Sequence, residues 1–110
     1  MMKLRVKIWL EEDGQPVFGD GRLKLLKEIQ KTGSITAATE NLGVSYRHAW
    51  GEIRKIEQRL GFKLIDTQTG GRGGGGASLT PRAIDFLQSY EKISKSVSAE
   101  ITKKFGILNL

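Results

Sequence analysis

The fold of this chain is decided by residues 34–61, which read SITAATENLGVSYRHAWGEIRKIEQRLG. Ser34 and Ser45 each precede an amphipathic run, and a serine hydroxyl can accept a hydrogen bond from the free backbone N–H groups of a first helical turn. Gly43 and Gly61 follow the two runs, and glycine is a common residue just beyond the end of a helix. The pattern predicts two consecutive helices joined by a short turn around Gly43.

Two helices joined by a turn of three or four residues that contains glycine, with the second helix basic, form a helix-turn-helix. Ala37 and Ala38 are small enough to let the two helices cross closely. Leu42 and Val44 flank the turn glycine and are expected to point into the core. The stretch therefore predicts a DNA-binding motif.

The second of these helices has an apolar and a polar face, because successive residues rotate by about 100°. The apolar face collects Ala49, Ile53, Ile56 and Leu60. The polar face, with one residue at its flank, is expected to present Arg47, Gly51, Arg54, Lys55, Gln58 and His48. Arginine and glutamine can hydrogen-bond to guanine and adenine edges, whereas lysine binds phosphates as a point charge. We interpret this polar face as the DNA contact.

Four residues of this helix keep two interpretations each. Gly51 costs about 1 kcal/mol of helix stability relative to alanine, so it either lets the backbone approach the base pairs or is simply tolerated. The Tyr46 hydroxyl either reaches a phosphate or packs at the edge of the apolar face. Trp50 is expected to pack against the core rather than to contact DNA, and His48 is either a DNA contact or an ordinary surface residue.

A glycine-rich run follows the helix pair, from Thr69 to Gly76. Short strand candidates at residues 62–66 and 77–79 flank it, so we predict a β-hairpin whose tip contacts phosphates or the minor groove. The contacts would come from Gly71, Arg72, Gly73 and Gly74. A linker without a specific role is the alternative. A nucleotide phosphate loop is excluded, because Ala77-Ser78 stand where that motif requires lysine and a hydroxyl residue.

The segments outside this region complete the predicted fold. Residues 3–10 alternate polar and apolar, which predicts a half-buried strand. A polar turn at residues 11–14 and a return strand or extended lead-in at 16–18 follow, and Asp20 is expected to cap a helix that ends at Gly33. Thr80-Pro81 predicts the start of a long helix. Its apolar stripe is Phe86, Tyr90, Ile93, Val97, Ile101 and Phe105.

Composition narrows the functional class. The chain has 110 residues, no cysteine, one histidine and a net charge of +6. Residues 44–82 hold seven basic and three acidic side chains, a net of +4, which favours a polyanionic partner, nucleic acid before an anionic membrane surface. We expect no catalytic site, no metal and no cofactor. No apolar run is long enough to span a bilayer, so we expect a soluble, cytoplasmic protein without membrane contact.

Residues 32–90 resemble the DNA-binding domain of the ModE family of molybdate-responsive transcription regulators, a relative of the LysR-type winged helices. The resemblance is carried by Gly33-Ser34-Ile35, Ala37-Ala38, Leu42-Gly43-Val44-Ser45-Tyr46-Arg47, Ala49-Trp50, Ile53, Leu79-Thr80 and, above all, the run from Thr69 to Ala77. It implies a winged helix-turn-helix over residues 1–80, including the N-terminal strand. It also implies a C-terminal dimerisation helix over residues 81–110 of the same domain. The whole fold is expected to be mostly α with a small β-wing.

The resemblance further implies how the chain works. A homodimer would read a roughly palindromic operator in double-stranded DNA, with Ser45, Tyr46, Arg47 and Trp50 on the recognition helix and Arg72 on the wing. The family dimerises partly through the long helix after the wing, which matches the stripe from Phe86 to Phe105. We expect Arg47, Arg54, Lys55 and Arg72 to supply much of the salt-dependent affinity.

Regulators of this family continue into an oxyanion-binding domain, and this chain ends at Leu110. We therefore expect no molybdate or tungstate site. Two alternatives to a sequence-specific regulator stay open. One is an architectural protein that coats DNA without an operator, and the other is an interaction module that docks a separate ligand-sensing partner.

Overall fold

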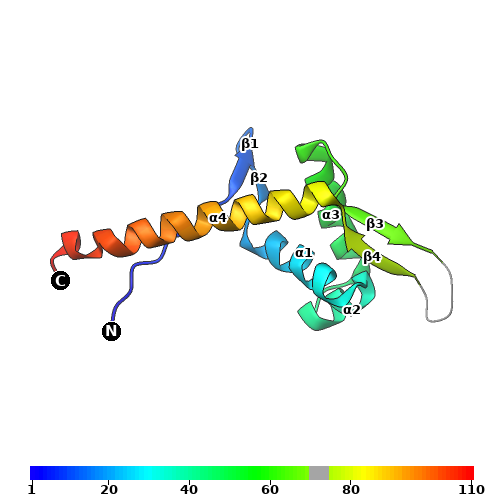
Figure 1. Cartoon of the computed structure of the whole chain (residues 1–110), viewed down its shortest axis with the longest axis horizontal. Coiled ribbons are helices and arrows are strands. Elements are labelled where there is room, and N and C mark those ends of the chain that lie inside the picture. Colours follow the sequence, from blue (N-terminus) through cyan, green and yellow to red (C-terminus); the bar gives the residue numbers. More distant parts are fainter. Residues whose placement is uncertain (70–74) are drawn as a thin grey trace.

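The elements of the chain follow the predicted order. The computed structural model describes residues 1–69 and 75–110. In chain order its elements are β1 (Leu10–Glu12), β2 (Gln15–Phe18), α1 (Asp20–Thr32), α2 (Ile35–Leu42), α3 (Tyr46–Leu60), β3 (Ile65–Gln68), β4 (Gly76–Leu79), α4 (Pro81–Lys104) and a 3₁₀ helix (Phe105–Leu108). Figure 1 shows a body of helices and hairpins from which α4 projects, so that the molecule measures 60 × 32 × 23 Å. The mostly helical fold with a small β-wing and a long C-terminal helix is confirmed.

The caps of the helix-turn-helix are those that the sequence predicts. The Ser34 hydroxyl accepts from the Ala37 N–H at 3.1 Å, and the Ser45 hydroxyl accepts from the His48 N–H at 3.0 Å. Gly43, at φ 70°, ends α2 in the left-handed conformation that side chains rarely adopt. The resulting turn of three residues, 43–45, fixes how α3 leaves α2.

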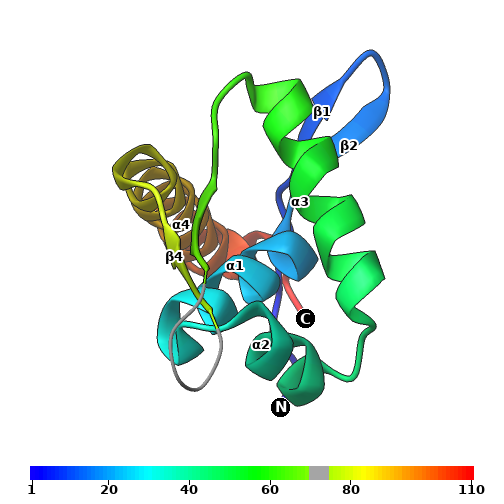
Figure 2. The same ribbon diagram turned by 90° about the vertical axis from the view of Figure 1, so that its right-hand side faces the viewer.

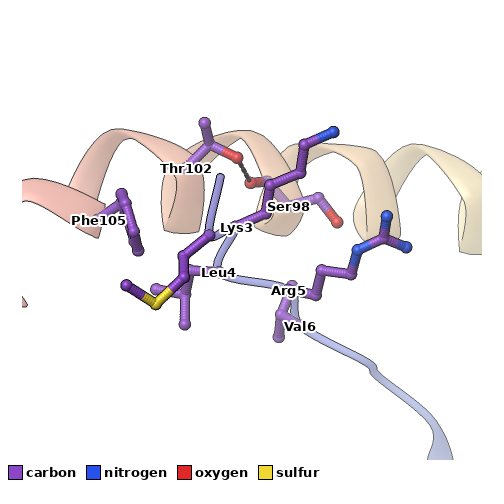
Figure 3. Close-up of a pocket in the computed structure, with 8 residues that line it drawn as sticks. Lys3, Leu4, Arg5, Val6, Ser98, Thr102 and Phe105 are labelled. Atoms are coloured by element: carbon purple, nitrogen blue, oxygen red, sulfur yellow. Dashed lines mark hydrogen bonds between the residues drawn. The ribbon is translucent and has the colours of Figure 1, made fainter.

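The prediction of a strand over residues 3–10 is wrong. Residues 1–9 form no strand, and β1 begins only at Leu10. A strand needs a neighbour, and β2 is long enough to pair only with residues 10–12. The preceding segment instead runs beside the last turns of α4, where Leu4 and Val6 line a groove of about 550 Å³ together with Ser98 and Phe105 (Figure 3). In this position Val6 and Ile8 are half-buried and Leu4 stays exposed, so the segment covers part of its apolar residues without pairing in a sheet.

Of the two alternatives for residues 16–18, the return strand is the one observed, as part of β2. Asp13 and Gly14 form the turn before it with φ of 53° and 76°, which is the geometry of a two-residue type I′ hairpin turn.

The prediction that Asp20 caps α1 is also wrong. Gly19 occupies the capping position without a side-chain hydrogen bond, and Asp20 is the first residue of the helix. The Asp20 carboxylate instead accepts from the Tyr90 hydroxyl at 3.0 Å, and the same hydroxyl lies 3.0 Å from the Ile8 carbonyl oxygen. A tertiary contact with α4 has thus replaced the local cap.

The β3–β4 hairpin is present, but its first strand lies further along the chain than residues 62–66. β3 runs from Ile65 to Gln68, since the Leu64 N–H donates to the Glu57 carboxylate at 2.8 Å and is not available for a strand. The Ala77 N–H donates to the Gly33 carbonyl at 2.9 Å, which fastens the hairpin to the end of α1. A Cβ on Gly75 would lie 2.1 Å from the Gln68 carbonyl oxygen, so the hairpin needs glycine there.

The core lies between α1, α3 and the first turns of α4. Its largest fully buried side chains are Phe18, Leu26, Ile29, Ile53, Ile56, Leu64 and Ile65. Phe18 packs edge-on against Phe86 and Tyr90, with ring centroids 4.9 and 5.0 Å apart. Tyr90 is only 5% exposed. The structure therefore places Tyr90 inside the protomer, and half-buried Phe86 also faces inward, so the exposed part of the predicted stripe begins at Ile93.

The long helix begins as predicted. The Thr80 hydroxyl accepts from the Ala83 N–H at 3.1 Å and donates to the Lys63 carbonyl at 2.7 Å. Within residues 1–69 and 75–110, no helix has the length and apolarity that crossing a membrane requires.

We predict that Tyr90 makes stability depend on alkaline pH. Burial, and then the hydrogen bond and negative charge of Asp20, raise the pKa of Tyr90 from 10.0 to about 12. A raised pKa stabilises the fold fully below pH 10, and this contribution is lost as pH rises towards 12, by about 1 kcal/mol at pH 11. Urea unfolding at pH 8 and pH 11 should show a larger loss for the wild type than for Tyr90→Phe. An equal loss in both proteins would contradict the assignment.

Candidate nucleic-acid interface

The polar face of α3 is exposed along its whole length. Every residue that the sequence predicts there is exposed, namely Ser45, Tyr46, Arg47, His48, Gly51, Arg54, Lys55 and Gln58. The opposite face is fully buried at Ala49, Ile53 and Ile56. Since the apolar face is fixed in the core, Arg47, Gly51, Arg54, Lys55 and Gln58 point away from the body of the molecule, while Ser45, Tyr46 and His48 lie at the edges of the exposed face.

Both carboxylates of α3 are withdrawn from this exposed face. Glu52 forms an ion pair with Arg22 of α1, with 2.6 Å between Nε and Oε2, and Arg22 also donates to the Val17 carbonyl. Glu57 accepts the Leu64 N–H. Internal partners therefore hold the two negative charges at half-buried positions, and the exposed face keeps Arg47 and the cations of the next turns. This sorting of charge is what a polyanion-binding surface requires.

The cations of α3 differ in what holds them. Arg59 is paired with Glu12 of β1 at 2.9 Å, and the Lys55 ammonium lies 4.0 Å from Glu52. The Arg54 guanidinium lies 5.7 Å from the centroid of the Trp50 ring. Trp50 itself is half-buried and packs against the core, as the sequence predicts.

A groove of about 430 Å³ separates the start of α3 from the β3–β4 hairpin. Figure 2 shows α3 and the hairpin on either side of α2. Tyr46 and Trp50 line the groove from α3, and its other lining residues are Ser34, Ile35, Thr36, Thr67, Gln68, Thr69, Gly75, Gly76 and Ala77. Thr67 and Gln68 are not predicted from the sequence as part of this surface, because their position beside α3 depends on how the hairpin docks onto the end of α1, and Thr36 reaches it from α2.

The predicted wing-tip residues Gly71, Arg72, Gly73 and Gly74 lie outside the described residues. The strands that carry them pair in register from Ile65 opposite Leu79 to Gln68 opposite Gly76. Across residues 1–69 and 75–110, no three side chains of histidine, aspartate or glutamate gather in a way that could hold a metal ion.

Comparison with known families decides the identity of this motif. The model of the lysR family of bacterial regulatory helix-turn-helix proteins matches residues 21–84, more than half of the chain. The chain belongs to this family. The matched range covers α1 to the start of α4, and therefore includes the helix-turn-helix, the wing and the exposed face of α3.

Within the lysR family, the chain is similar to ModE regulators. It is 40% identical over 75 residues to the transcriptional regulator ModE of Haemophilus influenzae, covering 68% of this chain and 29% of that protein. The DNA-binding transcriptional dual regulator ModE of Escherichia coli K12 is 38% identical over 82 residues, or 74% and 31% of the two chains. The molybdenum-pterin-binding protein MopB of Rhodobacter capsulatus is 35% identical over 92 residues, or 84% and 34%.

The chain thus spans about a third of the length of these relatives, and its lysR-family helix-turn-helix domain is ModE-like. Solved structures agree on the fold. The DNA-binding domain of CbnR in a DNA complex has a TM-score of 0.59 at 22% identity, covering 80% of this chain and 95% of that one. The BenM domain with benA site 1 DNA has a TM-score of 0.57 at 22% identity, covering 79% and 95%.

We predict that Gly51→Ala has opposite effects on folding and on DNA binding. A Cβ at Gly51 meets no atom within 4 Å, so alanine should raise the free energy of unfolding by about 0.5 to 1 kcal/mol. The added methyl would stand between the helix backbone and the base pairs, and DNA affinity should fall severalfold.

Gly106→Ala is the matched control, because its Cβ also meets nothing within 4 Å and lies at the far end of the molecule. Chemical denaturation and fluorescence anisotropy measure the two quantities. Unchanged affinity for Gly51→Ala would mean that the glycine is merely tolerated.

Proposed function

We propose that the chain regulates transcription as a homodimer that binds a roughly palindromic operator. The observation that carries this proposal is the exposed face of α3, which keeps Arg47, Arg54 and Lys55 while both carboxylates of the helix are bound internally. A recognition helix with this face fits the major groove, where base edges present acceptors to arginine. Since bacterial duplex DNA lies in the cytoplasm, the proposal places the protein there.

The residues of the face divide between reading bases and binding phosphates. Arg47 and Gln58 have side chains that can hydrogen-bond to guanine and adenine, and Lys55 is suited to phosphates. Ser45 and Tyr46 stand at the start of α3, where their hydroxyls reach the sugar–phosphate backbone in this arrangement. His48 flanks the same surface.

The wing supplies a second contact in this proposal. β3 and β4 form the far side of the groove that Tyr46 and Trp50 line. Arg72 and the neighbouring glycines, Gly71, Gly73 and Gly74, would bind phosphates or enter the minor groove, because glycine lets backbone N–H groups approach closely.

Dimerisation is assigned to the part of α4 that leaves the body. Ile93 is 57% exposed, while Val97, Ile101 and Phe105 follow at intervals of four residues and are half-buried. Two such helices packed side by side would cover these side chains. A dimer of this kind places two copies of α3 in major grooves about 34 Å, or a multiple of that, apart.

We predict that Arg47→Ala weakens specific binding more than non-specific binding. The duplex probe is one enriched from a random library by selection on the purified chain, and sonicated genomic DNA is the competitor. Loss of a bidentate base contact should lower affinity for the selected duplex about tenfold or more, while affinity for genomic DNA falls only a few-fold.

Arg59→Ala serves as the control, since Arg59 lies on the same helix but is paired with Glu12. Equal weakening on both DNAs by Arg47→Ala would make Arg47 a phosphate contact. A wild-type chain that binds the selected duplex no better than genomic DNA would favour the architectural alternative.

We predict that the chain sediments at twice its 12.2 kDa mass and that Ile93→Gln weakens the dimer by about tenfold. The substitution removes a large apolar side chain from the exposed stripe. Lys95→Gln is the control, because it lies about 200° around the same helix. A wild-type monomer at micromolar concentration would contradict the homodimer and favour a module that docks a separate ligand-sensing partner.

A further inference from the structure

We propose that Trp50 is a positioning residue for Arg54, and that this pair makes Arg54 a preorganised DNA contact. The proposal rests on the function proposed above, and it states which side chain holds Arg54 in position for its contact with DNA. It goes beyond the assignment of Trp50 to the core, since the ring that packs against the core also lies 5.7 Å from the guanidinium carbon of Arg54.

Three residues form a row along α3, one per turn. Tyr46 and Trp50 meet edge-on, with ring centroids 6.4 Å apart and an interplanar angle of 73°. Arg54 follows four residues later, with its guanidinium carbon 5.7 Å from the centroid of the Trp50 ring. Residues four apart are neighbours on a helix surface, so the row runs from the start of α3 along the border between its buried and exposed faces.

Trp50 is suited to act as a fixed platform. It is half-buried and packed against the core, and it lines the groove between α3 and the β3–β4 hairpin. The indole face attracts a cation through its quadrupole, and tryptophan is the strongest side chain for this interaction. A guanidinium can stack on the ring and still direct its N–H groups outward.

The neighbouring cations differ from Arg54 in the partners that hold them. Arg22, Arg59 and Lys63 are each held by a carboxylate, from Glu52, Glu12 and Asp66. A carboxylate orients a cation but also offsets its charge. Arg54 has no carboxylate within 4.0 Å among the described residues, and the aromatic ring orients it while leaving its full charge available for DNA.

Orientation before binding matters because an arginine side chain loses rotamer freedom when it is fixed in an interface. A guanidinium that is already held over an indole loses less on binding. Removing Trp50 should therefore weaken DNA binding through Arg54 alone, whereas a Trp50 that touched DNA itself would act independently of Arg54.

A double-mutant cycle tests this difference. Affinity for the selected duplex is measured for wild type, Trp50→Leu, Arg54→Ala and the double variant. We expect Trp50→Leu to lower affinity about three- to fivefold in the wild-type background and to have no further effect in the Arg54→Ala background. Trp50→Phe, which keeps an aromatic face and a core side chain, should restore most of the affinity. Thermal unfolding checks that each variant folds.

Lys55 provides the matched control, because it carries the same charge on the same exposed face and is next in sequence to Arg54. Trp50→Leu and Lys55→Ala should have additive effects on DNA affinity.

An NMR measurement without DNA accompanies the cycle. The Arg54 side-chain protons should show an upfield ring-current shift in the spectrum of the wild type, and this shift should be lost in Trp50→Leu.

Two results would overturn the positioning role. One is an undiminished loss from Trp50→Leu when Arg54 is alanine, and the other is the absence of any loss in the wild-type background. A wild-type chain that binds neither the selected duplex nor genomic DNA would instead overturn the proposed function itself. The failure of the positioning role and the failure of the proposed function are distinguishable, because only the failure of the proposed function abolishes DNA binding by the wild type.

Discussion

The burial of one face of α3 is the constraint on which the rest of the structure depends. Ala49, Ile53 and Ile56 are inaccessible to solvent, so α3 can neither rotate nor slide without exposing them. At about 25 cal/mol per Å² of apolar surface, such exposure would destabilise the fold by several kcal/mol. Because a helix is rigid about its axis, fixing this face also fixes the direction of Arg47, Arg54 and Lys55. The core thus determines the geometry of the surface that we propose to face DNA.

Ion pairs and hydrogen bonds then determine the charge of the exposed face of α3, whose direction the packing has fixed. The internal partners of Glu52 and Glu57 come from α1 and from the link to β3. Each contact gives a half-buried carboxylate a partner and at the same time keeps its negative charge off the exposed face of α3. The same contacts therefore stabilise the fold and leave the exposed face of α3 with an excess of positive charge. The net charge of +4 that the sequence gives to residues 44–82 lies mainly on this face of the helix and not on the side that carries Glu52 and Glu57.

Local signals in the sequence predicted the helices well and the strands less well. Ser34, Ser45 and Thr80 cap as expected, since a hydroxyl and a free N–H three residues later are close in any helix start. The strand at residues 3–10 failed for a different reason. Alternation indicates only that one side of an extended segment is apolar, and whether a neighbouring strand exists is decided elsewhere in the chain.

The sequence by itself determined the helix-turn-helix, the polar face of α3 and the position of the wing, because these depend on periodicity and on caps within a few residues. Only the tertiary structure decided that Tyr90 is buried in the core instead of lying on the exposed stripe, and that the Asp20 carboxylate accepts a hydrogen bond from its hydroxyl. It also placed Arg54 over Trp50 and Gln68 beside the groove. Burial and charge pairing between distant segments depend on which surfaces meet, and no local pattern specifies that.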